Sequence, residues 1–346
     1  MAAHMKKTVI RLSLVFLLSL VFLYFFFRSV DWGEVLHYLT DIDVKYFVLM
    51  VLLVPMHFVT RSIRWYYLLK HEKNHVSFFN RFAANAVGFT VTSIFPGRLG
   101  EIVRPLYLAQ KENMKKGFVV GTIVVERMFD MFTMCFLLGL FLIAKPLYSS
   151  LFNAPEKAYL ELHSWGIVGV AISIVILIFS LSLYFFKQKT LSFVSFLLKP
   201  VPHKITEKIL NLAEEFIHGL KFFHSIGNLL VYILLSMVVW LGIIFFYWIF
   251  FFAYNTPFPF FYLFPYVFLV MVGASIPTPG MVGSFHYFSK YAMMNFYNIS
   301  ASKAVGMTIV VHAIQIIMTC IIGYVILWKE GLSLLQLKKL GQERET

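Results

Sequence analysis

The chain has 346 residues, of which 60% are hydrophobic and 14% charged, and its formal net charge is +13. A soluble domain is about 45–50% apolar and about 25% charged, so this composition excludes an ordinary soluble enzyme, a disordered chain and a disulfide-rich secreted domain. We attribute the positive charge to basic loops held on one side of a membrane, and we expect no nucleic-acid partner.

Long apolar runs dominate the chain from its first residues onward. A helix needs about 20 mostly apolar residues to cross the hydrocarbon core of a bilayer. Six runs meet this requirement: 9–27, 46–70, 117–144, 165–186, 228–253 and 301–328. The sequence therefore predicts an all-α polytopic membrane protein with about six full spans.

Two further apolar stretches, about 79–112 and 261–299, are interrupted near their middles. Proline cannot donate a backbone hydrogen bond and glycine permits positive φ, so each interruption favours a turn between two half-helices. We expect two re-entrant helical hairpins, because broken backbone at membrane depth must be buried in protein or line a cavity. The alternative is that these stretches are additional spans, which gives eight or more. The hinge residues are Pro96, Gly97, Gly100, Pro277, Pro279, Gly280 and Gly283.

The distribution of basic residues predicts the orientation of the chain. With the N-terminus inside, the inner segments carry 21 Lys and Arg and the outer segments carry 6. The positive-inside rule then places both termini in the cytoplasm. We expect the membrane to be a plasma membrane, specifically a bacterial inner membrane. The segment 203–224 has helical apolar spacing with charges elsewhere, which predicts an amphipathic helix on the inner surface or a polar linker helix.

The two interrupted stretches also resemble each other in sequence. Ser93-Ile94-Phe95-Pro96-Gly97 parallels Ser275-Ile276-Pro277-Thr278-Pro279-Gly280, and each is followed by a span containing Thr-Ile-Val-Val. This recurrence predicts an inverted-topology repeat, in which the hairpins enter from opposite sides and meet near the midplane. The expected divisions are 1–45 (anchor helix and outer loop), 46–144 (repeat 1), 145–227 (connecting span and amphipathic helix), 228–328 (repeat 2) and 329–346 (cytoplasmic tail).

Ionisable residues inside the predicted spans are the first candidates for a functional site, because burying them is costly. Glu126, Arg127 and Asp130 share one side of a helix near the centre of their span. Arg61 and Arg64, three residues apart, could reach these carboxylates or an anionic headgroup. The alternatives are a purely structural ion cluster for the first group and arginines that extend to the interface for the second.

The hairpins add further candidates. Arg98, Glu101 and Arg104 follow the first Pro-Gly at helical spacing, which suits either a binding site or the exposed face of a surface helix. His286, Lys290 and His312 lie in the second half, where they are candidates for a proton relay or an outer gate, or for hydrogen-bonded packing residues. No P-loop, zinc-protease, nucleophile-elbow or Cys/His motif is present, so we expect no enzyme activity, cofactor or metal site.

These residues resemble the flippase-like family that includes the transmembrane region of lysylphosphatidylglycerol synthases. The segment Pro96-Gly97-Arg98-Leu99-Gly100-Glu101 is similar to that family's Pro-Gly-Arg-x-Gly-Glu motif, and Glu126-Arg127-x-x-Asp130 to its membrane-embedded Glu-Arg-x-x-Asp. Arg61-Ser62-Ile63-Arg64-Trp65 resembles its early arginine pair, and Pro279-Gly280-Met281-Val282-Gly283 its second Pro-Gly motif. His286 departs from the pattern, since many members have Glu near this position.

The resemblance implies transfer of a lipid or lipid-linked headgroup between leaflets. It does not imply lysyl transfer, because the residues after Trp328 form only a short basic stretch. We expect a flippase for an anionic or zwitterionic phospholipid, glycolipid or isoprenoid phosphate, in which Arg61, Arg64, Arg98 and Arg104 bind phosphate. Two alternatives are an accessory subunit that presents lipid to a separate lipid-modifying transferase, and an integral-membrane lipid-modifying enzyme.

Overall fold

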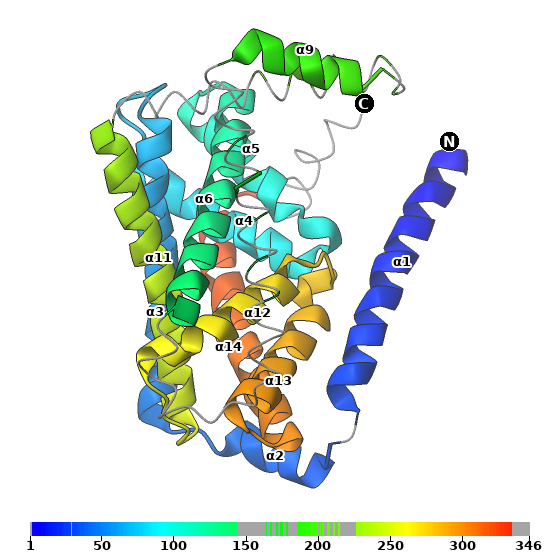
Figure 1. The fold of residues 1–346 in the computed structure, drawn as a ribbon, viewed down its shortest axis with the longest axis vertical. Coiled ribbons are helices and arrows are strands. Elements are labelled where there is room, and N and C mark those ends of the chain that lie inside the picture. Colours follow the sequence, from blue (N-terminus) through cyan, green and yellow to red (C-terminus); the bar gives the residue numbers. More distant parts are fainter. Residues whose placement is uncertain are drawn as a thin grey trace.

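The computed structural model describes residues 2–28, 30–143, 186–199 and 226–333, with isolated residues between 164 and 214. These residues form helices and contain no strand, and most of the helices pack into one bundle (Figure 1). The helices are α1 (Ala2–Phe27), α2 (Trp32–Thr40), α3 (Val44–Leu69), α4 (Phe78–Ile94), η1 (Pro96–Arg98), α5 (Gly100–Glu112), α6 (Lys116–Ile143), α9 (Lys187–Leu197), α11 (Ile226–Ala253), η3 (Phe260–Tyr262), α12 (Leu263–Ser275), η4 (Pro279–Met281), α13 (Ser284–Tyr297) and α14 (Ala301–Lys329).

Among the described residues, three helices are both long and apolar enough to cross a membrane: α3, α11 and α14. A fourth span would result if residues 13–27 and α2, which are bent by 94° to each other, form one broken span. The predicted span 117–144 is present as the 28-residue helix α6, but it carries three ionisable residues near its centre. The predicted span 165–186 and the predicted amphipathic helix 203–224 lie outside the described residues, apart from isolated positions.

Helix starts follow local capping signals. Asp43 precedes α3 and its carboxylate accepts the Lys45 amide at 2.8 Å. Asp31 precedes α2 in the same way and accepts the amides of Gly33 and Glu34. An aspartate at this position satisfies amides that have no partner within the helix. The segment expected to be only an outer loop therefore contains a helix, α2.

The helices α3 and α11 run antiparallel, side by side (Figure 1). The Asp43 amide, just before α3, donates to the carbonyl of Ala253 at the end of α11. Lys70, just after α3, donates to Asn228 near the start of α11 at 2.6 Å. These contacts define two ends of the bundle, which we call the Asp43 end and the Lys70 end.

Two helical hairpins enter the bundle from these opposite ends. The open end of α4–α5 lies at the Lys70 end, where Lys73 pairs with Glu112 at 2.7 Å. The open end of α12–α13 lies at the Asp43 end, where the Tyr297 hydroxyl donates to the Tyr262 carbonyl. The hairpins therefore point toward each other, as expected, whereas the internal repeat itself stays a prediction.

The turns of the two hairpins meet inside the bundle, where η1 contacts η4. Gly97 has φ +78° and Gly280 has φ +56°, conformations that favour glycine. A Cβ atom on Gly280 would lie 2.8 Å from the Ser93 carbonyl oxygen of the other hairpin. Glycine is therefore needed at position 280 both for its backbone conformation and for the close approach of the two turns.

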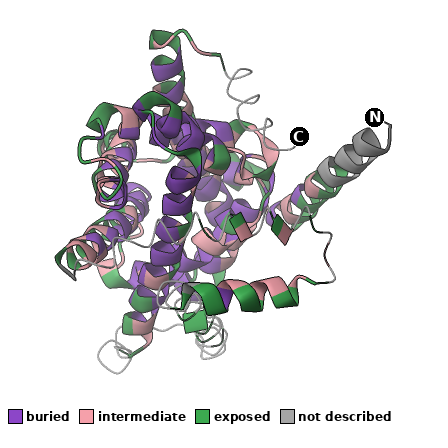
Figure 2. Cartoon of the chain, turned by 90° about the horizontal axis from the view of Figure 1, so that it is seen from above, coloured by how far each residue is buried: buried purple, intermediate pink, exposed green. Residues whose placement is uncertain are grey.

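Most of the buried apolar residues that the structure describes form one large core between facing helices, and Phe26, Val35 and Val305 form a small separate cluster (Figure 2). Large apolar side chains remain exposed on the outer faces of several helices, for example Leu52 of α3, Leu234 of α11 and Ile317 of α14. A soluble protein rarely exposes such continuous apolar surface, so these faces suit contact with lipid. The polar exceptions inside the core define the candidate site.

Candidate functional site

A cluster of charged side chains, most of them buried, lies where α3, η1, α5 and α6 meet. We call the eight residues the charged cluster: Arg61, Arg64, Arg98, Glu101, Arg104, Glu126, Arg127 and Asp130. At its centre, Arg104 donates two parallel hydrogen bonds to Glu126, at 2.8 and 2.9 Å. Glu126 has no exposed surface. A bidentate arginine–carboxylate pair is strong and directional, so it fixes both side chains.

Glu126 and Asp130 each contact several arginines. The Glu126 carboxylate lies 3.1 Å from Arg61, 3.3 Å from Arg64 and 2.9 Å from Arg127. Asp130 pairs with Arg64 at 2.6 Å and lies within 4 Å of Arg61 and Arg127. Arg61 and Arg64 are therefore directed at carboxylates, and neither extends to an interface. The described residues contain no group of three His, Cys, Asp or Glu that could hold a metal ion.

Aromatic and polar side chains support the cluster. The Arg104 guanidinium lies 4.2 Å above the Trp65 ring, and Arg64 lies 5.6 Å from the centre of the Tyr232 ring. Trp240 donates its indole N–H to Asp130 at 3.1 Å. Cation–π contacts and a hydrogen bond in a dry environment hold the charged groups in a defined geometry.

A cavity of about 800 Å³ lies against this cluster. Arg61, Arg98, Arg104 and Arg127 line it together with Glu101 and Asp130, whereas Arg64 and Glu126 lie behind them. The remaining wall is mostly apolar and comes from both halves of the chain. Representative residues of that wall are Val54, Met131, Ile243, Phe246, Met271 and Ile316. The cavity thus combines a cationic patch with an apolar surface.

Arg98 joins the two hairpins next to the cavity. It pairs with Glu101 at 3.1 Å and also donates to the Ala274 carbonyl near the end of α12 at 2.8 Å. Its φ of +55° is unusual for a non-glycine residue, so its position depends on the surrounding contacts. The predicted hinge residues Pro96 and Gly97 therefore place an arginine at the junction of the hairpins.

The candidates in the second half divide into two groups. His286 and His312 contact each other edge to face, with 4.6 Å between ring centres, and His312 also lines the cavity. Lys290 instead donates to the carbonyls of Phe26 and Arg28, at 2.8 and 2.9 Å. These two carbonyls lie at the end of α1, so Lys290 attaches α1 to α13. Its position does not bring it to the charged cluster.

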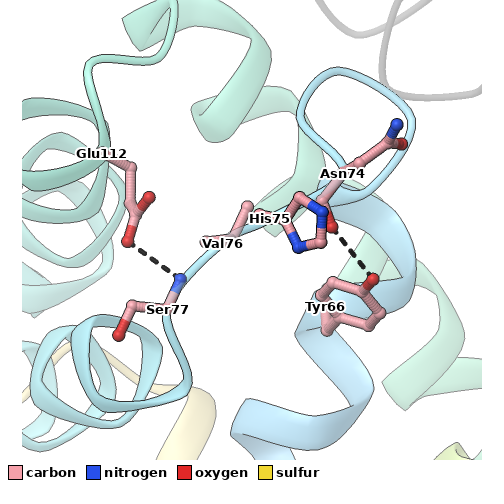
Figure 3. A pocket seen from close by; sticks show the side chains of 6 residues that line it. All are labelled: Tyr66, Asn74, His75, Val76, Ser77 and Glu112. Atoms are coloured by element: carbon pink, nitrogen blue, oxygen red, sulfur yellow. Dashed lines mark hydrogen bonds between the residues drawn. The ribbon is translucent and has the colours of Figure 1, made fainter.

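A second hollow, of about 530 Å³, lies at the Lys70 end and is lined by Tyr66, Asn74, His75, Val76, Ser77 and Glu112. Figure 3 shows Glu112 directed at the Ser77 amide, which donates to it at 3.0 Å. Burial by itself would raise the pKa of the Glu112 carboxyl, but hydrogen bonds from Lys73, Asn80 and Ser77 hold that pKa below its usual value. We interpret this group as a structural connection that closes the α4–α5 hairpin.

Four site residues were not predicted from the sequence. Three lie on α11, where Trp240 contacts Asp130 and both Ser236 and Tyr232 contact Arg64, and the fourth is His57, which accepts a hydrogen bond from Arg61 at 2.7 Å. Ser236 and Trp240 are four residues apart in an apolar helix, and His57 is four residues before Arg61. This i, i+4 spacing of polar groups was the available signal.

Comparisons with known proteins show the family of the chain. The profile of a family described as "Lysylphosphatidylglycerol synthase TM region" matches residues 10–323. The chain belongs to this family. It is also 25% identical over 334 residues to the UPF0104 membrane protein MJ1595 of Methanocaldococcus jannaschii, which covers 93% of this chain and 95% of that relative. No solved structure matched the chain. The apolar helices and the family together identify an integral membrane protein.

Proposed function

We propose that this protein is a flippase that moves a phosphate-bearing lipid between the two leaflets of its membrane. One observation carries the proposal: a cluster with more arginines than carboxylates borders an otherwise apolar cavity between two opposed hairpins. Arginine binds phosphate through a planar, permanently charged group, and the apolar wall suits the lipid tail. The name of the family supports a role connected with membrane lipids.

The charges at the two ends support a membrane orientation. The Lys70 end carries exposed lysines such as Lys115 and Lys116, whereas the Asp43 end carries Asp31, Glu34 and Asp41. The positive-inside rule assigns the Lys70 end to the cytoplasm. The α4–α5 hairpin then enters from the cytoplasm and the α12–α13 hairpin from outside, as halves of an inverted repeat.

In this mechanism the lipid phosphate enters the cavity while its tail stays in the surrounding bilayer. Glu126 and Asp130 hold Arg61, Arg64 and Arg104 in place, so the site is preorganised before lipid arrives. His286 and His312 are the candidates for a proton relay or an outer gate, because His312 borders the same cavity. Lys290 would hold α1 in place during these movements.

Leaflet exchange in reconstituted vesicles tests the proposal. We expect the purified protein to accelerate exchange of fluorescent phospholipids, and Arg98→Ala or Glu126→Gln to reduce the rate by more than about tenfold. Glu126→Gln removes one partner of buried charge pairs, a loss of about 2–5 kcal/mol, and Arg98→Ala removes a phosphate-binding charge from the cavity wall. Lys116→Gln, an exposed charge on the same helix as Glu126, is the matched control and should keep the wild-type rate.

The assay also separates the alternatives. Folded protein that gives no exchange would contradict the proposal and favour an accessory role beside a lipid-modifying partner. Chemical conversion of the lipid would favour an enzyme. Wild-type rates in both Arg98→Ala and Glu126→Gln would remove the charged cluster from the mechanism.

A further inference from the structure

The charge balance of the cluster restricts which headgroup it can accept. Its five arginines face three carboxylates, Glu101, Glu126 and Asp130, so its formal charge is +2. Each buried charge in a low-dielectric site must be compensated by a partner. An occupant with two negative charges would neutralise the described part of this site, and one with a single negative charge would not.

Two arginines are available to an occupant. Arg61, Arg64 and Arg104 are almost fully buried, whereas the side chains of Arg98 and Arg127 keep 29% and 33% of their surface exposed, although each of these two is also paired with a carboxylate. Both line the cavity. An anion that enters the cavity therefore meets two partly exposed guanidinium groups.

Both carboxylates in the described lining of the cavity are already paired with arginine. Of the two acidic residues in its described lining, Glu101 pairs with Arg98 at 3.1 Å and Asp130 pairs with Arg64 at 2.6 Å. An ammonium group carried by an aminoacyl, ethanolamine or choline headgroup would therefore compete with arginines for these two carboxylates, whereas a phosphate would not.

We propose that the cavity selects a lipid whose headgroup is a terminal phosphate monoester, held between Arg98 and Arg127. This inference rests on the proposed flippase function. A monoester carries a charge of about −1.5 to −2 at pH 7, and a diester carries about −1 because its second ionisable oxygen is esterified. A phosphatidate and an isoprenoid monophosphate both offer this chemistry, and they differ only in the tail.

A pair of lipids that differ by one methyl group tests the selection. Vesicles would contain either phosphatidate or its phosphate methyl ester with identical acyl chains, and exchange would be measured with the purified full-length protein. We expect the monoester to move at least about tenfold faster, the effect of about 1.4 kcal/mol in binding or in the barrier. A third set of vesicles would contain polyprenyl phosphate, and its exchange rate compared with that of phosphatidate shows which of the two tails the protein prefers.

Variants of the two accessible arginines provide the second arm. Arg127→Gln and Arg98→Gln should each reduce the preference for the monoester over its methyl ester to less than about threefold, since each removes one compensating charge. Lys116→Gln should leave the preference unchanged. Elution of each variant as a single species in size-exclusion chromatography, and its melting temperature, establish that it is folded. Arg98 is the safer of the two positions, because its partner Glu101 is partly exposed whereas the partners of Arg127 are buried.

The outcomes separate this inference from the proposed function. Equal exchange of phosphatidate, its methyl ester and phosphatidylglycerol would overturn the selection of a monoester while leaving the flippase intact. Faster exchange of an aminoacylated lipid would also overturn it. No exchange of any lipid above the rate in protein-free vesicles would contradict the flippase itself.

Discussion

At the scale of single residues, Glu126 organises the candidate site. It is fully buried and lies within 3.3 Å of Arg61, Arg64, Arg104 and Arg127. A carboxylate among four guanidinium groups compensates charges that would otherwise repel one another without solvent to screen them. The close spacing of these arginines therefore depends on Glu126, and the cavity keeps its shape only while that carboxylate is ionised and in place.

The substitution Glu126→Gln tests this dependence through stability. Removing one partner of a buried ion pair costs about 3–5 kcal/mol, so we expect a clear fall in the melting temperature of the detergent-solubilised protein. The double variant Glu126→Gln/Arg104→Gln should be less destabilised than the sum of the two single variants, because it removes both members of the bidentate pair. Exactly additive losses would show that Arg104 and Glu126 do not interact.

At the scale of elements, the α4–α5 hairpin depends on close packing at Gly100. A Cβ atom on Gly100 would lie 1.8 Å from the Gly88 carbonyl oxygen of α4. The two helices therefore approach so closely at this point that only the hydrogen atom of a glycine fits between them. The same contact aligns α5 so that Arg104 reaches Glu126.

We expect Gly100→Ala to separate α4 from α5 and to lower both the melting temperature and the exchange rate. The matched control is Gly139→Ala in α6, where a Cβ atom would meet nothing within 4 Å. Because alanine stabilises a helix interior by about 0.5–1 kcal/mol relative to glycine, the control should be neutral or slightly more stable. A Gly100→Ala protein as stable and active as wild type would contradict the described packing.

The elements also show how much of the fold and of the site could be predicted from the sequence. Helical spacing placed Glu126 and Asp130 on one side of their helix and Arg61 and Arg64 on one side of theirs, and the Pro-Gly turns located both hairpins. The α2 helix was not predicted because its nine residues are too few for a span, although Asp31 and Glu34 provide a capping signal. The contact from Arg98 to Ala274 and that from Trp240 to Asp130 join residues more than 100 positions apart, and local spacing carries no information about such contacts.

At the scale of the whole molecule, the account depends on which end faces the cytoplasm. Exposed positions are available at both ends: Lys115 at the Lys70 end and Glu34 at the Asp43 end. The two native cysteines are Cys135, which is buried, and Cys320, which is partly buried. Replacing them with serine gives a background in which one new cysteine can be labelled.

In intact cells, a membrane-impermeant maleimide should label Glu34→Cys and should not label Lys115→Cys until the cells are opened. This result follows from the excess of basic residues at the Lys70 end. The reverse pattern would invert the assigned topology and place the charged cavity's hairpin on the outer side. Labelling of both positions in intact cells would contradict a single orientation.

The central claim is that the cavity beside the charged cluster holds a lipid phosphate, and the lipid that remains bound after gentle purification tests it most directly. Native mass spectrometry should show about one phosphorylated lipid per wild-type chain. It should show little or none on Arg98→Gln and Arg127→Gln prepared in parallel, because each variant removes a charged group that donates hydrogen bonds to the phosphate. Lys116→Gln should retain the lipid. The same lipid bound equally to all four proteins, or a retained lipid without phosphate, would contradict the account.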